Sequence, residues 1–243
     1  QGSESSRSSA TSYALTGCVS TLLEIRGVGI GRTSFKRRIQ TTFLISMSYL
    51  KTAYNNSEEL KAEIAKAKKT QVNAALETKR NVYKDTILTI DLDKNEAIDF
   101  EVTIRDALQL QLLKERTRPF AYFILPEEKA ITERLKILGL ELSLLDEEKE
   151  FEVESYTVTE YEREAKKYEG VNRQTISTEV KTIKKSFPKG TVVVKMDQSK
   201  ANMAMEVLEP EVKNSFITFE VIETAKGAVL PIYRLIKTDT SLR

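Results

Sequence analysis

The spacing of hydrophobic positions changes along the chain, and each spacing predicts a different element. Residues 13–25 form a short apolar run with several β-branched members, which favours a buried strand. Residues 34–56 place large apolar side chains three or four positions apart, which predicts a helix with one apolar face. The members of this face are Phe35, Ile39, Phe43, Met47 and Leu50. Between the two elements, glycines at alternate positions predict a turn.

A second helix is expected from Ser57, because serine is a favourable N-cap and the glutamates that follow it suit the first turn of a helix. Its apolar stripe is thin, so we expect it to lie on a surface or to connect two parts of the molecule. The chain is therefore expected to have three parts, which are residues 1–56, a connecting helix in residues 57–84, and residues 85–243.

The last part, residues 85–243, alternates between strand and helix patterns. Apolar and polar residues alternate in 85–93 and again in 98–106, which predicts a hairpin. Further strands are expected near residues 118–126, 140–145, 150–162, 177–187, 191–196 and 230–237, and helices within 127–142 and 197–211. Gly139 is expected to lie just beyond the last turn of the first of these helices.

The charge balance argues against a nucleic-acid partner, and the lengths of the apolar runs argue against a membrane span. Lysine and arginine number 38, aspartate and glutamate number 36, and the net charge is +2. These charges are interspersed, without the basic stripe expected of a nucleic-acid-binding surface, so no nucleic-acid partner is expected. No apolar run approaches the roughly 20 residues of a membrane-spanning helix, so no membrane span is expected either.

Two residue types limit the chemistry that this chain can perform alone. It contains no histidine, which excludes a Ser-His-Asp triad within the chain and any histidine-containing zinc site. The single cysteine, Cys18, permits no intrachain disulfide, and its apolar surroundings in the sequence predict a buried, inert thiol.

The glycine turn differs from known phosphate-binding loops. Gly27, Gly29 and Gly31 are spaced as G-x-G-x-G, which differs from the G-x-G-x-x-G fingerprint of dinucleotide-binding domains. The Gly-Lys-Ser/Thr sequence of a Walker loop is also absent. A flexible turn is therefore the favoured interpretation, and a nucleotide-binding domain is a disfavoured alternative.

Glu24 is the candidate for catalysis, because it ends an apolar run. A carboxylate at the carboxyl end of a buried strand lies where α/β sheets place their active sites, and it could serve as a general acid or base. The other interpretation is a structural ion pair with Arg26, two residues further on and on the same side of a strand. The spacing alone favours the ion pair and leaves both interpretations open.

Residues 13–32, with the helix that follows them, resemble the end of a zinc metallocarboxypeptidase domain of the carboxypeptidase A type. The shared signature is an apolar residue, a glutamate, a variable residue and an arginine, and here it spans residues 23–26. A glycine-containing turn and a long C-terminal helix follow it in both cases. The resemblance covers roughly residues 1–56.

The resemblance implies an α/β fold class. Residues 1–56 would be the end of a mixed-sheet catalytic domain, with its last strand and C-terminal helix, followed by a smaller α+β domain in residues 85–243. It also implies that Glu24 is the general base and acid of peptide hydrolysis and that Arg26 supports it. The later residues resemble the C-terminal extension of some large bacterial members, and this resemblance implies no activity for them.

The family's zinc ligands, a His-x-x-Glu pair and a distant histidine, precede this strand and are not in the chain. The resemblance therefore implies a C-terminal fragment of a secreted or periplasmic protein, whose upstream catalytic region holds the zinc and binds a peptide or protein substrate. The chain alone is expected to bind no catalytic zinc and to be inactive. A non-catalytic module that contacts a partner protein or the cell wall is the alternative from another class.

Overall fold

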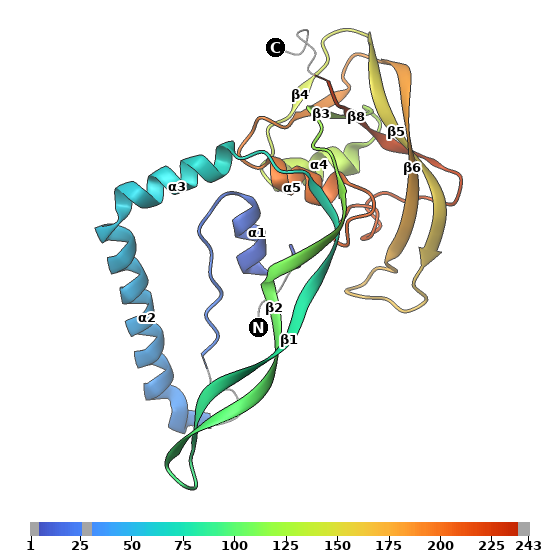
Figure 1. The fold of residues 1–243 in the computed structure, drawn as a ribbon. Coiled ribbons are helices and arrows are strands. Elements are labelled where there is room, and N and C mark those ends of the chain that lie inside the picture. Colours follow the sequence, from blue (N-terminus) through green and yellow to red (C-terminus); the bar gives the residue numbers. More distant parts are fainter. Residues whose placement is uncertain (1–4, 26–30, 238–243) are drawn as a thin grey trace.

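The N-terminal part of the molecule is an open arrangement of helices (Figure 1). The computed structural model describes residues 5–25 and 31–237 of the chain. The first elements are helix α1 (Ser9–Leu15), the 3₁₀ helix η1 (Gly31–Ser34), helix α2 (Phe35–Asn55) and helix α3 (Ser57–Lys69). Helix α2 confirms the helix expected at residues 34–56. It meets α3 end to end, and the far end of α3 leads back to the rest of the molecule.

The strand expected at residues 13–25 is not found, and that prediction is wrong. Helix α1 includes the start of this run and ends in a turn at Gly17, whose φ is +77°. Residues 18–25 form neither a helix nor a strand. A strand needs a neighbour to pair its backbone N–H and C=O groups, and none of the described strands lies beside these residues. The apolar run therefore has no sheet to join in this chain.

The expected connecting helix is shorter than residues 57–84. Helix α3 ends at Lys69, and a strand begins at Ala74, so the second half of that prediction is wrong. The N-cap is Asn56 rather than the expected serine, and its side chain makes no capping hydrogen bond to α3. Pairing with a segment far along the chain decides the structure from Ala74 onward, and this long-range pairing overrides the local pattern.

Strands β1 (Ala74–Asp91) and β2 (Glu96–Arg116) form a long antiparallel hairpin that projects from the main sheet (Figure 1). The hairpin confirms the predicted alternation and turn, and it extends beyond the predicted strands. In the turn, Oδ1 of Asp91 accepts a hydrogen bond of 3.0 Å from the backbone N–H of Asp93. Asn95 has a φ of 55°, a left-handed conformation that asparagine tolerates in turns.

The second sheet has six strands in the order β4-β7-β3-β8-β5-β6, and every neighbouring pair is antiparallel. Its strands are β3 (Ala121–Ile124), β4 (Ser143–Leu144), β5 (Lys149–Arg163), β6 (Gln174–Phe187), β7 (Val192–Lys195) and β8 (Val229–Leu235). The helices are α4 (Lys129–Ile137) and α5 (Ala201–Leu208). Each of these elements confirms one expected from the sequence, with shifted ends.

The six-stranded sheet carries a hydrophobic cluster on each face. Side chains of β3 alternate between them, since Tyr122 and Ile124 join one cluster while Ala121 and Phe123 join the other. Buried residues of α4 and α5 belong to the first and larger cluster. The second cluster is aromatic, and the ring centroids of Phe123 and Phe151 lie 4.8 Å apart. This part of the chain is therefore folded around its own core.

The described residues thus combine helices with two antiparallel sheets, which agrees with the mixed helix and strand content expected. The mixed sheet of a carboxypeptidase-type domain is not formed by the described part of the chain. The division into domains stays a prediction, except that the connecting helix expected at 57–84 ends at Lys69 and strand β1 runs across residue 84.

Candidate functional site

Glu24 lies in the segment that leads from α1 to the start of α2 (Figure 1). Residues 18–25 have no regular secondary structure, and the Glu24 side chain is exposed. Leu22 and Leu23 beside it are also exposed, at 54% and 39%. Arg26 lies outside the described residues, so its ion pair with Glu24 stays a prediction. The segment presents a carboxylate flanked by apolar side chains to solvent.

Cys18 and the glycine turn are the other features of this segment for which the sequence gives a prediction. Cys18 is exposed rather than buried, so that prediction is wrong, and the reason is that its run does not join a sheet. Its Sγ lies 3.4 Å from Oγ1 of Thr16. Gly27 and Gly29 of the predicted turn lie outside the described residues, and Gly31 begins η1 with a φ of +64°.

The predicted apolar face of α2 is present but uncovered. None of the described side chains of α2 is buried. The five large apolar residues that define the face are between 47% and 68% exposed. A helix with such a stripe ordinarily buries it against another part of a protein, and large contiguous apolar patches mark interaction surfaces. The segment around Glu24 and the helix after it therefore share one property, which is apolar surface without a covering partner among the described residues.

A buried polar cluster joins the root of the hairpin to the six-stranded sheet. Arg116, the last residue of β2, donates from Nη1 to Oε2 of Glu209 at 2.7 Å and from Nη2 to Glu211. Lys114 adds a second ion pair to Glu211, at 2.9 Å. The guanidinium of Arg116 also lies over the ring of Tyr156, 5.2 Å from its centroid. The end of the hairpin is therefore fixed to the sheet by charge-assisted hydrogen bonds.

Glu209 is the centre of this cluster and is fully buried. The hydroxyls of Tyr122 and Tyr156 donate to its two oxygens, at 2.6 Å and 2.9 Å. Nε of Arg234 lies 3.2 Å from Oε1, and Nη1 of the same residue pairs with Glu154 at 2.6 Å. A buried carboxylate is stable only when it is paired and hydrogen-bonded, and Glu209 has four such neighbours, counting Arg116.

The electrostatics of the cluster follow from burial and from Glu209. Burial raises the pKa of the Tyr122 and Tyr156 hydroxyls, and the nearby carboxylate of Glu209 raises it further, so both phenols remain protonated donors. Burial lowers the pKa of Arg116, but Tyr156, Glu209 and Glu211 outweigh burial and the net pKa is raised. These groups are held in fixed protonation states, which suits a structural joint rather than proton transfer.

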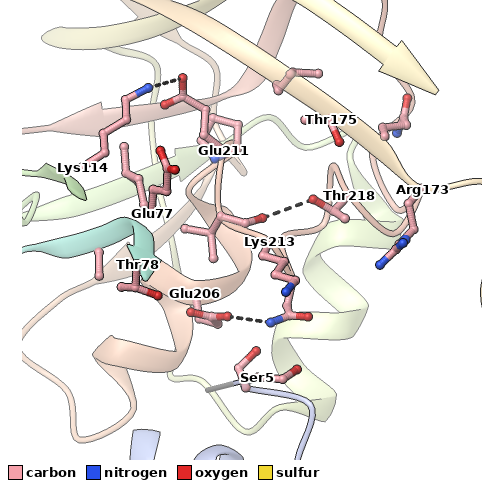
Figure 2. A pocket seen from close by; sticks show the side chains of 18 of the residues that line it. Ser5, Glu77, Thr78, Lys114, Arg173, Thr175, Glu206, Glu211, Lys213 and Thr218 are labelled. Atoms are coloured by element: carbon pink, nitrogen blue, oxygen red, sulfur yellow. Dashed lines mark hydrogen bonds and ion pairs between the residues drawn. The ribbon is translucent and has the colours of Figure 1, made fainter. Parts of the chain in front are cut away.

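A cavity of about 730 Å³ lies where the N-terminal segment, the hairpin root and the sheet meet (Figure 2). Its walls include Ser5, Glu77, Lys114, Arg173, Glu206 and Glu211. Many of the charged side chains there already have an ion-pair or hydrogen-bond partner. Lys114 binds Glu211, Arg173 binds Glu164 at 2.7 Å, and Oε1 of Glu206 accepts from Asn214 at 3.3 Å. The arrangement is typical of a junction between segments.

Two of the glutamates that line this cavity, Glu206 and Glu211, have opposite pKa shifts. Burial raises the pKa of Glu206, despite hydrogen bonds from Ser6 and Asn214 that oppose the change. Burial alone would also raise the pKa of Glu211, but the hydrogen bond from Lys114 and the charge of Arg116 outweigh it, and the net pKa is lowered. The surroundings of Glu206 therefore favour its neutral form, and the surroundings of Glu211 favour its ionised form.

Across residues 5–25 and 31–237, no three or more Cys, Asp or Glu side chains are grouped as metal ligands would be. The described helices include none that is both long and apolar enough to cross a membrane.

Comparisons with known proteins give a consistent relationship. No family model matches the chain. No solved structure matches it either. "Carboxypeptidase 2" of Trichophyton equinum is 30% identical over 225 residues, and the proteins of the same name from Trichophyton tonsurans and Trichophyton rubrum are each 29% identical over 225 residues. The chain is related to carboxypeptidases. In all three cases the match covers 91% of this chain and 42% of the relative, so the chain spans less than half the length of these carboxypeptidases.

The Glu209 cluster was missed by the sequence analysis of this carboxypeptidase-related chain. The sequence pattern predicts only that residues 208–211 belong to the helix expected within 197–211. A signal was present, because Glu209 follows a mainly apolar helix and precedes Pro210, where a carboxylate has little access to water. Its arginine partners, Arg116 and Arg234, come from distant strands, and the sequence alone does not bring them together.

Proposed function

We propose that the chain is part of a longer zinc-dependent metallocarboxypeptidase of the carboxypeptidase A type, a secreted or periplasmic enzyme that hydrolyses C-terminal peptide bonds of peptides or proteins. The match to fungal carboxypeptidases across 91% of the chain carries this proposal. Since that match covers 42% of the relative, most of the relative's length lies outside it. In this proposal the parent, meaning the full-length protein, contains an upstream catalytic region that corresponds to the unmatched length.

The zinc ligands belong to the upstream region in this proposal. The chain has no histidine, and its described carboxylates and thiol do not gather into a group of three. The described side chains therefore do not fit a catalytic zinc site, and we assign no metal-dependent step to them.

Glu24 is the proposed general base and acid. It takes a proton from the attacking water and passes it to the leaving amine of the peptide bond. Both transfers require a carboxylate that is held beside the reacting groups, which an exposed segment without secondary structure does not provide. We therefore propose that residues 18–25 pair with the sheet of the upstream region and become its last strand.

Apolar surface supports this docking. Leu22, Leu23 and the five large side chains on the α2 face are exposed. Full burial of one large apolar side chain contributes about 1.5–3 kcal/mol. Packing this surface against the upstream region would therefore stabilise the segment around Glu24 and orient the carboxylate.

The test is the substitution Glu24→Gln in the parent. Glutamine keeps the size of the side chain but cannot exchange protons, so kcat for release of C-terminal residues should fall by about 10²- to 10⁴-fold. Zinc content, measured by elemental analysis, should remain that of the unsubstituted parent. Glu59→Gln is the matched control, because Glu59 is an exposed carboxylate on α3, and it should leave both quantities unchanged.

Two outcomes would reject the assignment. Turnover that survives Glu24→Gln would show that another group moves the proton. A parent without zinc and without peptidase activity would instead favour the non-catalytic interaction module.

A further inference from the structure

The β1–β2 hairpin has two unlike faces. Its register places Ile87 opposite Phe100 and Tyr83 opposite Ile104, and residues two apart on a strand point to the same face. One face is therefore mainly apolar, and we call it the apolar hairpin face. Its members are Tyr83, Ile87, Ile98, Phe100, Val102 and Ile104, with Asp85 and Thr89 as polar residues among them.

The opposite face is mixed. Lys84 and Glu101 form an ion pair there at 2.7 Å, and Thr86 lies beside them on the same face. Leu88 and Ile90 also lie on this face and are 74% and 66% exposed. Val82 lies on this face as well and is 54% exposed. It stands opposite Arg105, and Leu88 stands opposite Asp99, so charged side chains interrupt the apolar ones. Apolar residues interspersed with charges are ordinary on a protein surface, so the mixed face suits contact with water.

The apolar hairpin face lacks a covering element among the described residues. The hairpin is a sheet of two strands, and no third described strand pairs with it. Ile87 and Phe100, at the centre of the face, are 43% and 55% exposed. A two-stranded hairpin is at best marginally stable in water unless its apolar face packs against something else. The hairpin root is fixed to the sheet through Arg116, but the projecting part beyond it needs another partner.

We propose that the upstream catalytic region of the parent covers the apolar hairpin face. This inference rests on the proposed function, which supplies that region. More than half of the relatives' length lies outside their match to this chain. A match that covers 91% of the chain leaves out too few residues to omit the whole hairpin, so these relatives combine at least part of the hairpin with the additional length.

This chain would then contact the upstream catalytic region at two places. Helix α2 and the segment around Glu24 form the first contact with the catalytic region, and the apolar hairpin face forms the second. Since the Arg116–Glu209 cluster holds the hairpin root, the second contact fixes the six-stranded sheet relative to the catalytic region. In this arrangement the six-stranded sheet holds the hairpin root in position and takes no part in the chemistry.

The experiment is photo-crosslinking in the parent. A benzophenone amino acid replaces Phe100, and in a matched control it replaces Leu88 on the mixed face. Irradiation of the residue-100 variant should yield a crosslink to peptides that precede Gln1, identified by mass spectrometry, and the residue-88 variant should lack that crosslink. Ile87, with Ile90 as its control, provides a second pair if the first variant does not fold.

Three results would overturn the inference. They are crosslinks that stay within residues 1–243, crosslinks between two copies, and equal upstream crosslinks from both faces. Crosslinking needs no turnover, so it separates this inference from the proposed function. Upstream crosslinks in a parent whose Glu24→Gln variant stays active would reject the role of Glu24 and keep the contact. Loss of turnover in the Glu24→Gln variant without upstream crosslinks would keep the role of Glu24 and reject the hairpin contact.

Discussion

The helices before the hairpin and the six-stranded sheet after it both have regular secondary structure, but only the sheet has a core. No described hydrophobic side chain before Ala74 is buried, whereas every residue of β3 is. An isolated helix gains little stability without packing, even at the 21 residues of α2. A correct helix prediction therefore does not identify the part of the protein against which the helix packs.

The Arg116–Glu209 cluster is the boundary between these two regions. On one side the chain packs around two hydrophobic clusters, and on the other it presents apolar faces to solvent. Substitutions in the cluster and in the sheet should therefore reduce stability strongly, while equivalent substitutions in the N-terminal helices should have little effect on this chain.

The largest effect is expected from Glu209→Ala. Removal of this carboxylate leaves Arg116 and Arg234 buried without it, and breaking a buried ion pair in this way costs about 3–5 kcal/mol. The free energy of unfolding, measured with urea, should fall by this amount. Glu147→Ala is the control, because Glu147 is exposed in a loop of the same region. If Glu209→Ala changes stability no more than this control does, the cluster is not the joint between the regions.

A pair of identical substitutions compares the two regions directly. Leu135→Ala in α4 removes a fully buried side chain and should destabilise the chain by about 2–5 kcal/mol. Leu50→Ala in α2 removes a side chain that is 64% exposed, and its effect should lie within about 0.5 kcal/mol of zero. Urea unfolding of both variants provides the measurement. A large loss in the Leu50 variant would show that α2 is packed in the isolated chain.

The sequence predicted local elements well where periodicity and pairing agree. Strand β3 is predicted by a continuous apolar run, and β5 and the hairpin by the alternation of apolar and polar residues. Gly139 was correctly expected to follow α4, since its φ of +74° is the left-handed conformation that glycine favours.

Sequence prediction failed where the structure depends on a partner. The apolar run at residues 13–25 has the composition of a buried strand, but composition does not supply the neighbouring strands. The same reason exposes Cys18 and leaves Glu24 in solvent. The candidate site around Glu24 could therefore be proposed from the signature at residues 23–26, while its geometry could not be predicted from this chain.

A smaller effect is expected from glycine substitutions that compare the two regions. Gly139→Ala introduces a Cβ against the end of the Lys200 side chain at a left-handed position, which should cost about 1–2 kcal/mol. Gly31 also has a left-handed φ, but no described atom lies within 4 Å of the Cβ that alanine would add. Because the helices after Gly31 lack a core, Gly31→Ala should leave the urea midpoint nearly unchanged. Equal shifts in both variants would mean that the two regions unfold together.

The smallest effect concerns pH and the cavity at the junction. The raised pKa of Glu206 means that the folded state binds its proton more tightly than the unfolded state does. Its contribution to stability is therefore present below the ordinary carboxyl pKa and is lost as pH rises through the raised value. Glu206→Gln removes this loss, so the variant should gain stability relative to the unsubstituted chain on going from acidic to neutral pH.

Glu211 should show the opposite sign, and this makes it the internal control. Its pKa is lowered in the folded state, so its contribution is present above the ordinary carboxyl pKa and is lost as pH falls through the lowered value. Glu211→Gln should therefore be less stable than the unsubstituted chain at neutral pH, and the difference should shrink on acidification. Urea midpoints measured across this range test both signs. If the two variants shift in the same direction, Lys114 and Arg116 do not hold Glu211 ionised at the hairpin root, and the junction depends on Glu209 alone.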